Sequence, residues 1–244
     1  MKRFWKQADV AAVENGYQVR LDGRPLRTPA KAAMILPTQA LAHMVAEEWN
    51  AVEDVVRPQD MPATRMANAA IDKVAQSAAE VADMLAEYGD SDLLCYRAEQ
   101  PQELVELQNR EWDPLLDWAA AELAAPLAVR RGVMHQRQDP ETLDRLRAEV
   151  HALGVFELAA FHDLVTISGS LVIAWAATKS LLPLDELWSR ACLDELWQER
   201  QWGPDDEARA LRARKRNDFF NAARFFDLSR SDAATDPEKT TRQG

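Results

Sequence analysis

Residues 8–36 decide the fold class, and they read ADVAAVENGYQVRLDGRPLRTPAKAAMIL. Short apolar runs are separated here by Asn15-Gly16 and Asp22-Gly23, dipeptides that accept the positive φ of a tight hairpin turn. The pattern therefore predicts a small antiparallel meander. Pro37-Thr38 follows it, and apolar residues at helical spacing predict a helix over residues 39–52 on which the strands can pack.

Helical periodicity replaces the strand pattern after the proline-bounded connection at residues 57–62, and no convincing strand signal returns. Apolar spacing instead predicts helices over residues 63–75, 78–88, 103–123, 140–152, 155–180 with a break near Gly169, 184–201 and 205–227. The fold class is thus α+β. We expect a β-rich N-terminal domain with one helix over residues 1–60, a larger all-helical domain over residues 61–228 and a disordered tail over residues 229–244.

Composition points to a protein partner. The chain has 244 residues and a formal net charge of -11, which disfavours nucleic acids and anionic membranes because such a surface repels phosphates. Its two cysteines are far apart in the sequence, as expected in a reducing compartment. The longest apolar run, residues 164–177, is too short to span a bilayer, and no leader pattern is visible. We expect a bacterial cytoplasmic protein without membrane insertion.

Catalytic and metal-binding motifs are missing from the sequence. The eight glycines form no phosphate-binding loop, and the four histidines lack the spacing of metal ligands. Asp90 and Asp92 are too few for a cation site, and Asp92 before Leu93-Leu94 suits helix capping better. We therefore expect no enzymatic activity, no cofactor and no metal.

One enzyme alternative remains open in the central stretch, residues 90–118. It places a small-molecule site between Asp92, Cys95, Arg97 and Glu111, with Cys95 as the nucleophile. A reactive thiol needs exposure and a positive neighbour, and only Arg97 is close in the sequence.

The other interpretation of this stretch is architectural. Asp92 and Asp113 would then cap helices, Pro114 would begin a new helix, and Cys95 and Trp112 would lie in the core. Arg97 would pair with a buried carboxylate.

The face of the expected helix over residues 184–202 carries the strongest candidate for a binding surface. At 100° per residue, one face holds Leu184, Trp188, Ala191, Glu195, Glu199 and Trp202. The two glutamates could pair with arginines across a helix packing, since buried charges are nearly always paired. Alternatively the face is open to a partner, with tryptophans as anchors and carboxylates for specificity. The candidate partner-binding residues are Trp188, Glu195, Gln198, Glu199 and Trp202.

The last expected helix is basic and then aromatic. Its basic residues are expected to face acidic neighbouring helices, while Phe219, Ala222 and Phe226 form a core stripe.

A series of short segments resembles the ATP synthase assembly chaperone family that binds the alpha subunit of the soluble catalytic sector. The resemblance spans residues 3–228. Its segments are 16–24 with Thr28-Pro29, 47–49, 61–64, 70–72, 92–97, Gln108, 112–114, 168–170 and 198–203.

This resemblance implies a β-rich domain joined to a helical one, and a protein that is not an enzyme. It also implies that the chain holds the unassembled alpha subunit and shields the surface used against the beta subunit, without nucleotide or metal. A general holdase or scaffold is a further alternative.

Overall fold

The meander at residues 8–36 forms as expected in the computed structural model, which describes residues 1–230. Strand β1 (Ala8–Val13) pairs antiparallel with β2 (Gly16–Leu21), and β2 pairs with β3 (Arg24–Pro25) and β4 (Ile35–Leu36). Gly16 has a φ of +137°, and a Cβ there would collide with the carbonyl oxygen of Leu36. A glycine is therefore required where the hairpin meets β4.

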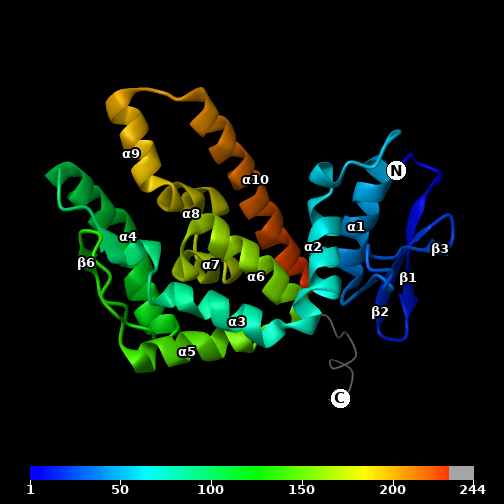
Figure 1. The fold of residues 1–244 in the computed structure, drawn as a ribbon, viewed down its shortest axis with the longest axis horizontal. Coiled ribbons are helices and arrows are strands. Elements are labelled where there is room, and N and C mark those ends of the chain that lie inside the picture. Colours follow the sequence, from blue (N-terminus) through cyan, green and yellow to red (C-terminus); the bar gives the residue numbers. More distant parts are fainter. Residues whose placement is uncertain (231–244) are drawn as a thin grey trace, which may run out of the picture.

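Helix α1 (Gln39–Ala51) covers one face of this sheet (Figure 1). Thr38 caps it by accepting a hydrogen bond from the Leu41 amide at 3.1 Å. The buried face of α1 includes Leu41, Val45 and Trp49, and the Trp49 ring lies 5.0 Å from the ring of Trp5. The amphipathic pattern of the sequence thus builds the N-terminal core.

The remainder of the described chain is mostly helical, and Figure 1 shows these helices grouped beside the sheet and α1. In chain order they are α2 (Pro62–Asp72), α3 (Ala78–Ala86), α4 (Gln102–Glu122), α5 (Pro140–His151), α6 (Val155–Ser168), α7 (Leu171–Thr178), α8 (Leu184–Ala191), α9 (Leu193–Trp202) and α10 (Asp206–Ser229). The α+β fold class is confirmed.

The centre of the helical part is the pair α6 and α7. Every residue of α7 is buried, and α10 packs along α6. The expected break near Gly169 is present, because Gly169 takes a φ of +72° and ends α6. Ser170 then caps α7 by accepting from the Ile173 amide at 3.0 Å.

The C-terminal half of α10 supplies the predicted core stripe, since Phe219, Ala222 and Phe226 are all buried. The last turn also reaches the N-terminal part, where the Thr38 hydroxyl donates to the Leu228 carbonyl oxygen. Helix α10 therefore contacts both parts of the molecule.

One short strand pair lies among these helices. Strands β5 (Tyr96–Arg97) and β6 (Arg130–Arg131) form a short parallel pair. Two residues are too few to show an alternating pattern, so periodicity could not predict these strands.

Other expectations concern the ends of the two parts. The domain boundary at residue 60 stays a prediction. The proposed tail falls almost wholly on residues 231–244, which lie outside the described residues. Within residues 1–230, no helix has both the length and the apolarity to cross a membrane.

Candidate functional site

The expected helix over residues 184–202 is interrupted at Cys192, which has a φ of -101° and a ψ of 16°. Helices α8 and α9 consequently point in different directions (Figure 1). The single apolar face expected from periodicity is therefore wrong. Trp188 is buried against Phe219 with their rings 5.7 Å apart, whereas Trp202 is 76% exposed.

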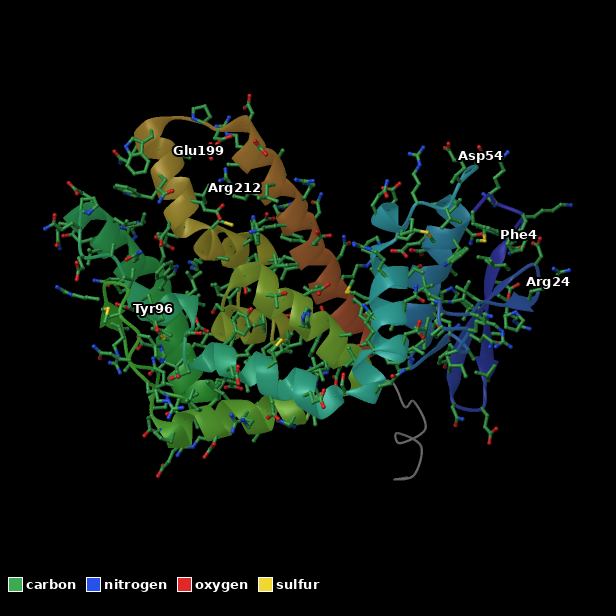
Figure 2. The ribbon with its side chains drawn as sticks, in the orientation of Figure 1. Phe4, Arg24, Asp54, Tyr96, Glu199 and Arg212 are labelled. Carbon is green, nitrogen blue, oxygen red and sulfur yellow. The ribbon has the colours of Figure 1, made fainter. Side chains whose placement is uncertain are left out.

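Glu199 faces α10 rather than the solvent. Its carboxylate accepts hydrogen bonds from Arg209 and Arg212, so the arginine-pairing alternative holds for this residue (Figure 2). Those bonds, with that from Arg212 the larger cause, hold the pKa of Glu199 below its ordinary value. The hydrogen bonds of Glu199 with Arg209 and Arg212 connect the end of α9 to the N-terminal part of α10.

Glu195 is only loosely held by comparison. Its carboxylate lies 3.8 Å from Arg212, and its side chain is 58% exposed. Gln198 is also exposed, one turn further along α9. These two residues and Trp202 border a cavity of about 470 Å³ between α9 and α10. Exposed Leu211 of α10 lies on its opposite side.

The surface at the α9–α10 tip therefore combines apolar and charged groups. We use this name for Glu195, Gln198, Trp202 and Leu211 with the Glu199–Arg212 pair beneath them. Exposed aromatic and aliphatic side chains beside carboxylates are typical of a protein-binding surface.

Asp92 in the central stretch is an architectural residue, as the capping interpretation predicts. Its carboxylate accepts from the Leu94 amide at 2.9 Å, the Val172 amide at 3.0 Å and the Ser170 hydroxyl at 2.7 Å. Burial raises the pKa of Asp92. One carboxylate thus joins the turn before β5 to the first turn of α7.

Arg97 pairs with Asp113, at 2.8 Å between Nη2 and Oδ1. The arginine is the buried partner, with 1% of its side chain exposed against 50% for Asp113. Burial lowers the pKa of Arg97. Asp113 is not the expected helix cap, because α4 continues through Pro114. Trp112 and Leu115, which flank Asp113 and Pro114, are both buried.

The residues of the enzyme alternative do not form one site. Asp92 bonds to α7, Arg97 to Asp113, and Glu111 lies 3.3 Å from Arg190 of α8. Cys95 is buried, and desolvation raises the pKa of its thiol to about 12. In the described part of the chain, no group of three or more histidine, cysteine or acidic side chains could hold a metal ion.

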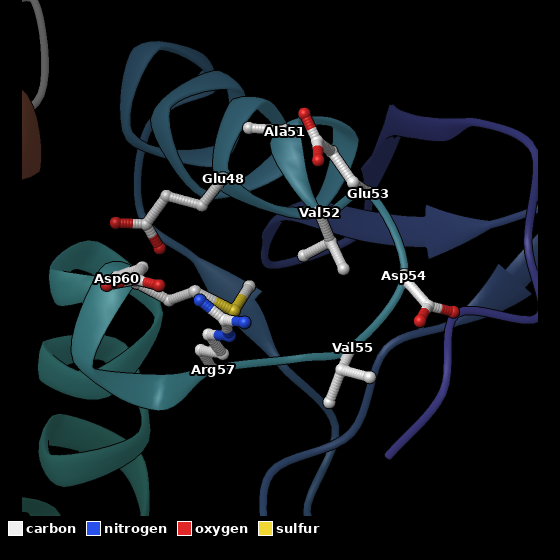
Figure 3. Close-up of a pocket in the computed structure, with 9 residues that line it drawn as sticks. Glu48, Ala51, Val52, Glu53, Asp54, Val55, Arg57 and Asp60 are labelled. Atoms are coloured by element: carbon white, nitrogen blue, oxygen red, sulfur yellow. The ribbon is translucent and has the colours of Figure 1, made fainter.

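A half-buried carboxylate in α1 escaped prediction from the sequence. Glu48 of α1 accepts from the Ala63 amide at 2.6 Å and from the Thr64 amide at 2.8 Å, so it caps α2 from a neighbouring helix. Figure 3 shows it beside a cavity of about 290 Å³ that Arg57 and Asp60 also line. Burial raises the pKa of Glu48. Periodicity along one helix cannot reveal a cap supplied by another.

The same fold occurs in a solved bacterial structure. Atp12 from Paracoccus denitrificans is 47% identical in sequence, with a TM-score of 0.91, and the match covers 94% of this chain and 98% of that one. The chain belongs to the ATP12 chaperone family. The Atu1473 protein from Agrobacterium tumefaciens is 40% identical, with a TM-score of 0.91, and the match covers 94% of this chain and 86% of that one.

Two sequence comparisons agree with this assignment. The family model described as "ATP12 chaperone protein" matches residues 2–120. The "Protein atp12, mitochondrial" of Schizosaccharomyces pombe is 28% identical over 224 residues, which are 86% of this chain and 76% of that protein. ATP12 proteins are ATP synthase assembly chaperones, so the chain belongs to a chaperone family rather than an enzyme family. The α9–α10 tip lies beyond the residues that the ATP12 model matches.

Proposed function

We propose that this ATP12 protein binds the unassembled alpha subunit of ATP synthase and shields the surface used against the beta subunit until the catalytic sector assembles. The contact lies at the α9–α10 tip. We place this activity in the bacterial cytoplasm, in keeping with the bacterial origin of the solved relatives.

The observation that carries the proposal is the exposure of Trp202. A tryptophan side chain that is 76% exposed leaves a large apolar area in water, and a partner that covers it gains that area. Leu211, on the other side of the cavity, is 45% exposed. Together they provide an apolar centre for a protein contact.

The candidate residues have different roles in this contact. Glu195 and Gln198 are exposed and supply a carboxylate and an amide to the client. Glu199 acts through Arg209 and Arg212, because it keeps α9 and α10 together. Trp188 lies beneath the surface and supports α8 against Phe219. We expect direct contact from Glu195, Gln198 and Trp202.

Co-purification with the alpha subunit from the same organism tests the proposal. We expect the wild-type protein to retain the alpha subunit, and Trp202→Ala to weaken retention about tenfold or more, as for an interface anchor. Glu195→Lys should also weaken it. Glu53→Lys makes the same charge change at an exposed position of the N-terminal part and serves as the control.

Circular dichroism and melting temperature must show that each variant is folded. A wild-type protein that retains no alpha subunit would overturn the proposal. Full retention by folded Trp202→Ala and Glu195→Lys variants would instead remove the α9–α10 tip as the contact.

Competition with the beta subunit tests the shielding role. If the chaperone covers the surface used against beta, added beta subunit should displace it from alpha in proportion to concentration. A stable complex of all three proteins would contradict shielding. Equal suppression of aggregation for unrelated unfolded proteins would favour the general holdase.

A further inference from the structure

The loop after β6 displays two apolar side chains at the surface. Val133 is 92% exposed and Met134 is 75% exposed, more than most other large apolar residues of the described chain. The surrounding residues 130–137 read RRGVMHQR, with three arginines and no acidic residue in a chain of net charge -11. This loop is therefore a basic, apolar feature on an acidic protein.

Hydrogen bonds hold both ends of this loop. The Gly132 amide donates to the Arg97 carbonyl at 2.9 Å, and Gly132 takes a φ of +76°. On the far side, the Tyr96 hydroxyl lies 3.0 Å from Nδ1 of His135. The backbone amide of Gln138 donates to the Asp90 carboxylate at 2.7 Å. Val133 and Met134 are thus presented at a defined position, which lowers the entropy cost of covering them.

A cleft of about 900 Å³ lies beside the two side chains. The loop forms one wall through Arg131, Val133 and Met134, while Gln108 of α4 and Asp194 of α9 line another part. Gln108 donates to Asp194 at 2.8 Å, which engages one oxygen of that carboxylate. Glu99 also lines the cleft, and its carboxylate lies beside Gly132. Among the described residues, Arg131 belongs to none of the salt bridges within 4.0 Å. Arg131 is exposed and remains available to an acidic group of a partner.

The cleft and the α9–α10 tip are at the two ends of one short helix. Asp194 is in the first turn of α9 and Trp202 is its last residue. The ten residues of α9 extend about 15 Å, which is less than the width of an ordinary protein interface. A single client can therefore contact both surfaces.

We propose that the loop and cleft form a second contact for the client subunit, binding a segment that places an apolar side chain against Val133 and Met134 and a carboxylate at Arg131. This inference rests on the proposed function, because the same alpha subunit is the occupant. A concave cleft beside the exposed pair favours a protein over a lipid surface, which fills no cleft.

The test measures binding of purified alpha subunit to full-length chaperone variants. The double variant Val133→Ser/Met134→Ser should bind about tenfold or more weakly, because it removes two apolar contacts. Its matched control, Val13→Ser/Val55→Ser, changes two apolar residues of the N-terminal part that are 36% and 42% exposed. The control should bind as the wild type does.

Charge reversal provides an independent arm. Arg131→Glu should weaken binding most at low salt, with the difference from wild type shrinking as salt screens the lost attraction. Arg24→Glu makes the same change in net charge at exposed β3 and should leave binding unchanged (Figure 2). Melting temperatures should match between each variant and its control.

The outcomes separate this inference from the proposed function. Failure of the wild-type protein to bind alpha overturns the proposed function and the second contact with it. Wild-type binding that is unchanged in both folded loop variants overturns the second contact alone. Suppose that the loop variants bind alpha as the wild type does. Loss of their binding to phosphatidylglycerol vesicles would then assign the loop to a membrane, and loss of a dimer in sedimentation would assign it to a second copy of this chain. Either result would overturn the second contact.

Discussion

Arg212 of α10 donates to the carboxylate of Glu199 in α9, and Arg209 donates to the other oxygen of the same carboxylate. Because these bonds lower the pKa of Glu199, they stabilise the folded state above the ordinary pKa of 4.5. The stabilisation is lost as the pH falls through the lowered pKa.

The variant Glu199→Gln should therefore melt at a lower temperature than wild type at neutral pH. The difference should begin to shrink as the pH falls below 4.5 and should close only below the lowered pKa, where the wild-type carboxylate becomes protonated. Paired melting curves from pH 7 to pH 3 measure it. A difference that stays constant over this range would show that the charge of Glu199 is irrelevant to the helix pair.

Removing Asp113 should expose the cost of a buried arginine charge. Asp113→Ala leaves the buried Arg97 without its carboxylate, and we expect a loss of about 2–3 kcal/mol in the free energy of unfolding. The double variant Arg97→Met/Asp113→Ala should recover part of that loss, since no charge remains buried. Urea unfolding of the wild type, the double variant and the two single variants Arg97→Met and Asp113→Ala measures the coupling between the two side chains. Losses that add up in the double variant would contradict the coupling.

Replacing Asp92 by asparagine should destabilise the junction with α7. The amide keeps one acceptor but turns its NH2 either toward the Val172 amide or toward the Leu94 amide and the Ser170 hydroxyl, at a cost of about 2 kcal/mol. Ser170→Ala removes one donor to this carboxylate but also the cap of α7, so it should cost about 1–2 kcal/mol. Urea denaturation measures the stability of both variants. An Asp92→Asn variant as stable as the wild type would contradict this role of the Asp92 carboxylate.

Neither cysteine should react in the folded protein. Desolvation raises the pKa of both Cys95 and Cys192 to about 12, and both thiols are buried. A disulfide reagent at pH 8 should therefore modify no thiol until urea unfolds the chain, after which both react. Rapid modification of Cys95 in the native protein would revive the enzyme alternative.

Local chemistry explains which parts of the fold the sequence could predict. Asn15-Gly16 and Asp22-Gly23 act within their own turns, so the meander was visible without tertiary information. Gly169 likewise marks a helix end by its own conformation. Thr38 caps α1 through an amide three residues away.

Features that depend on distant partners were missed. The break at Cys192 has no glycine or proline to mark it, and the direction of α9 depends on Arg209 and Arg212 of the next helix. The proline at position 114 suggested a boundary, but burial of Trp112 and Leu115 keeps α4 continuous. Periodicity therefore put Trp188 and Trp202 on one face, whereas the structure buries Trp188 and exposes Trp202.

The bond between Thr38 and the Leu228 carbonyl joins residues that are 190 positions apart. Thr38→Val should thus cost about 1–2 kcal/mol through loss of both this bond and the α1 cap, measured by urea unfolding. An unchanged midpoint would contradict this.

The same bond has a consequence for synthesis. At about 5–20 residues per second, a ribosome needs about 10–40 s to make the chain between these two residues. During that interval α10 is absent, and the surfaces of α1 and α2, and of α6 once it is made, lack the helix that covers them. This chaperone therefore passes through a vulnerable stage of its own before it can protect another subunit.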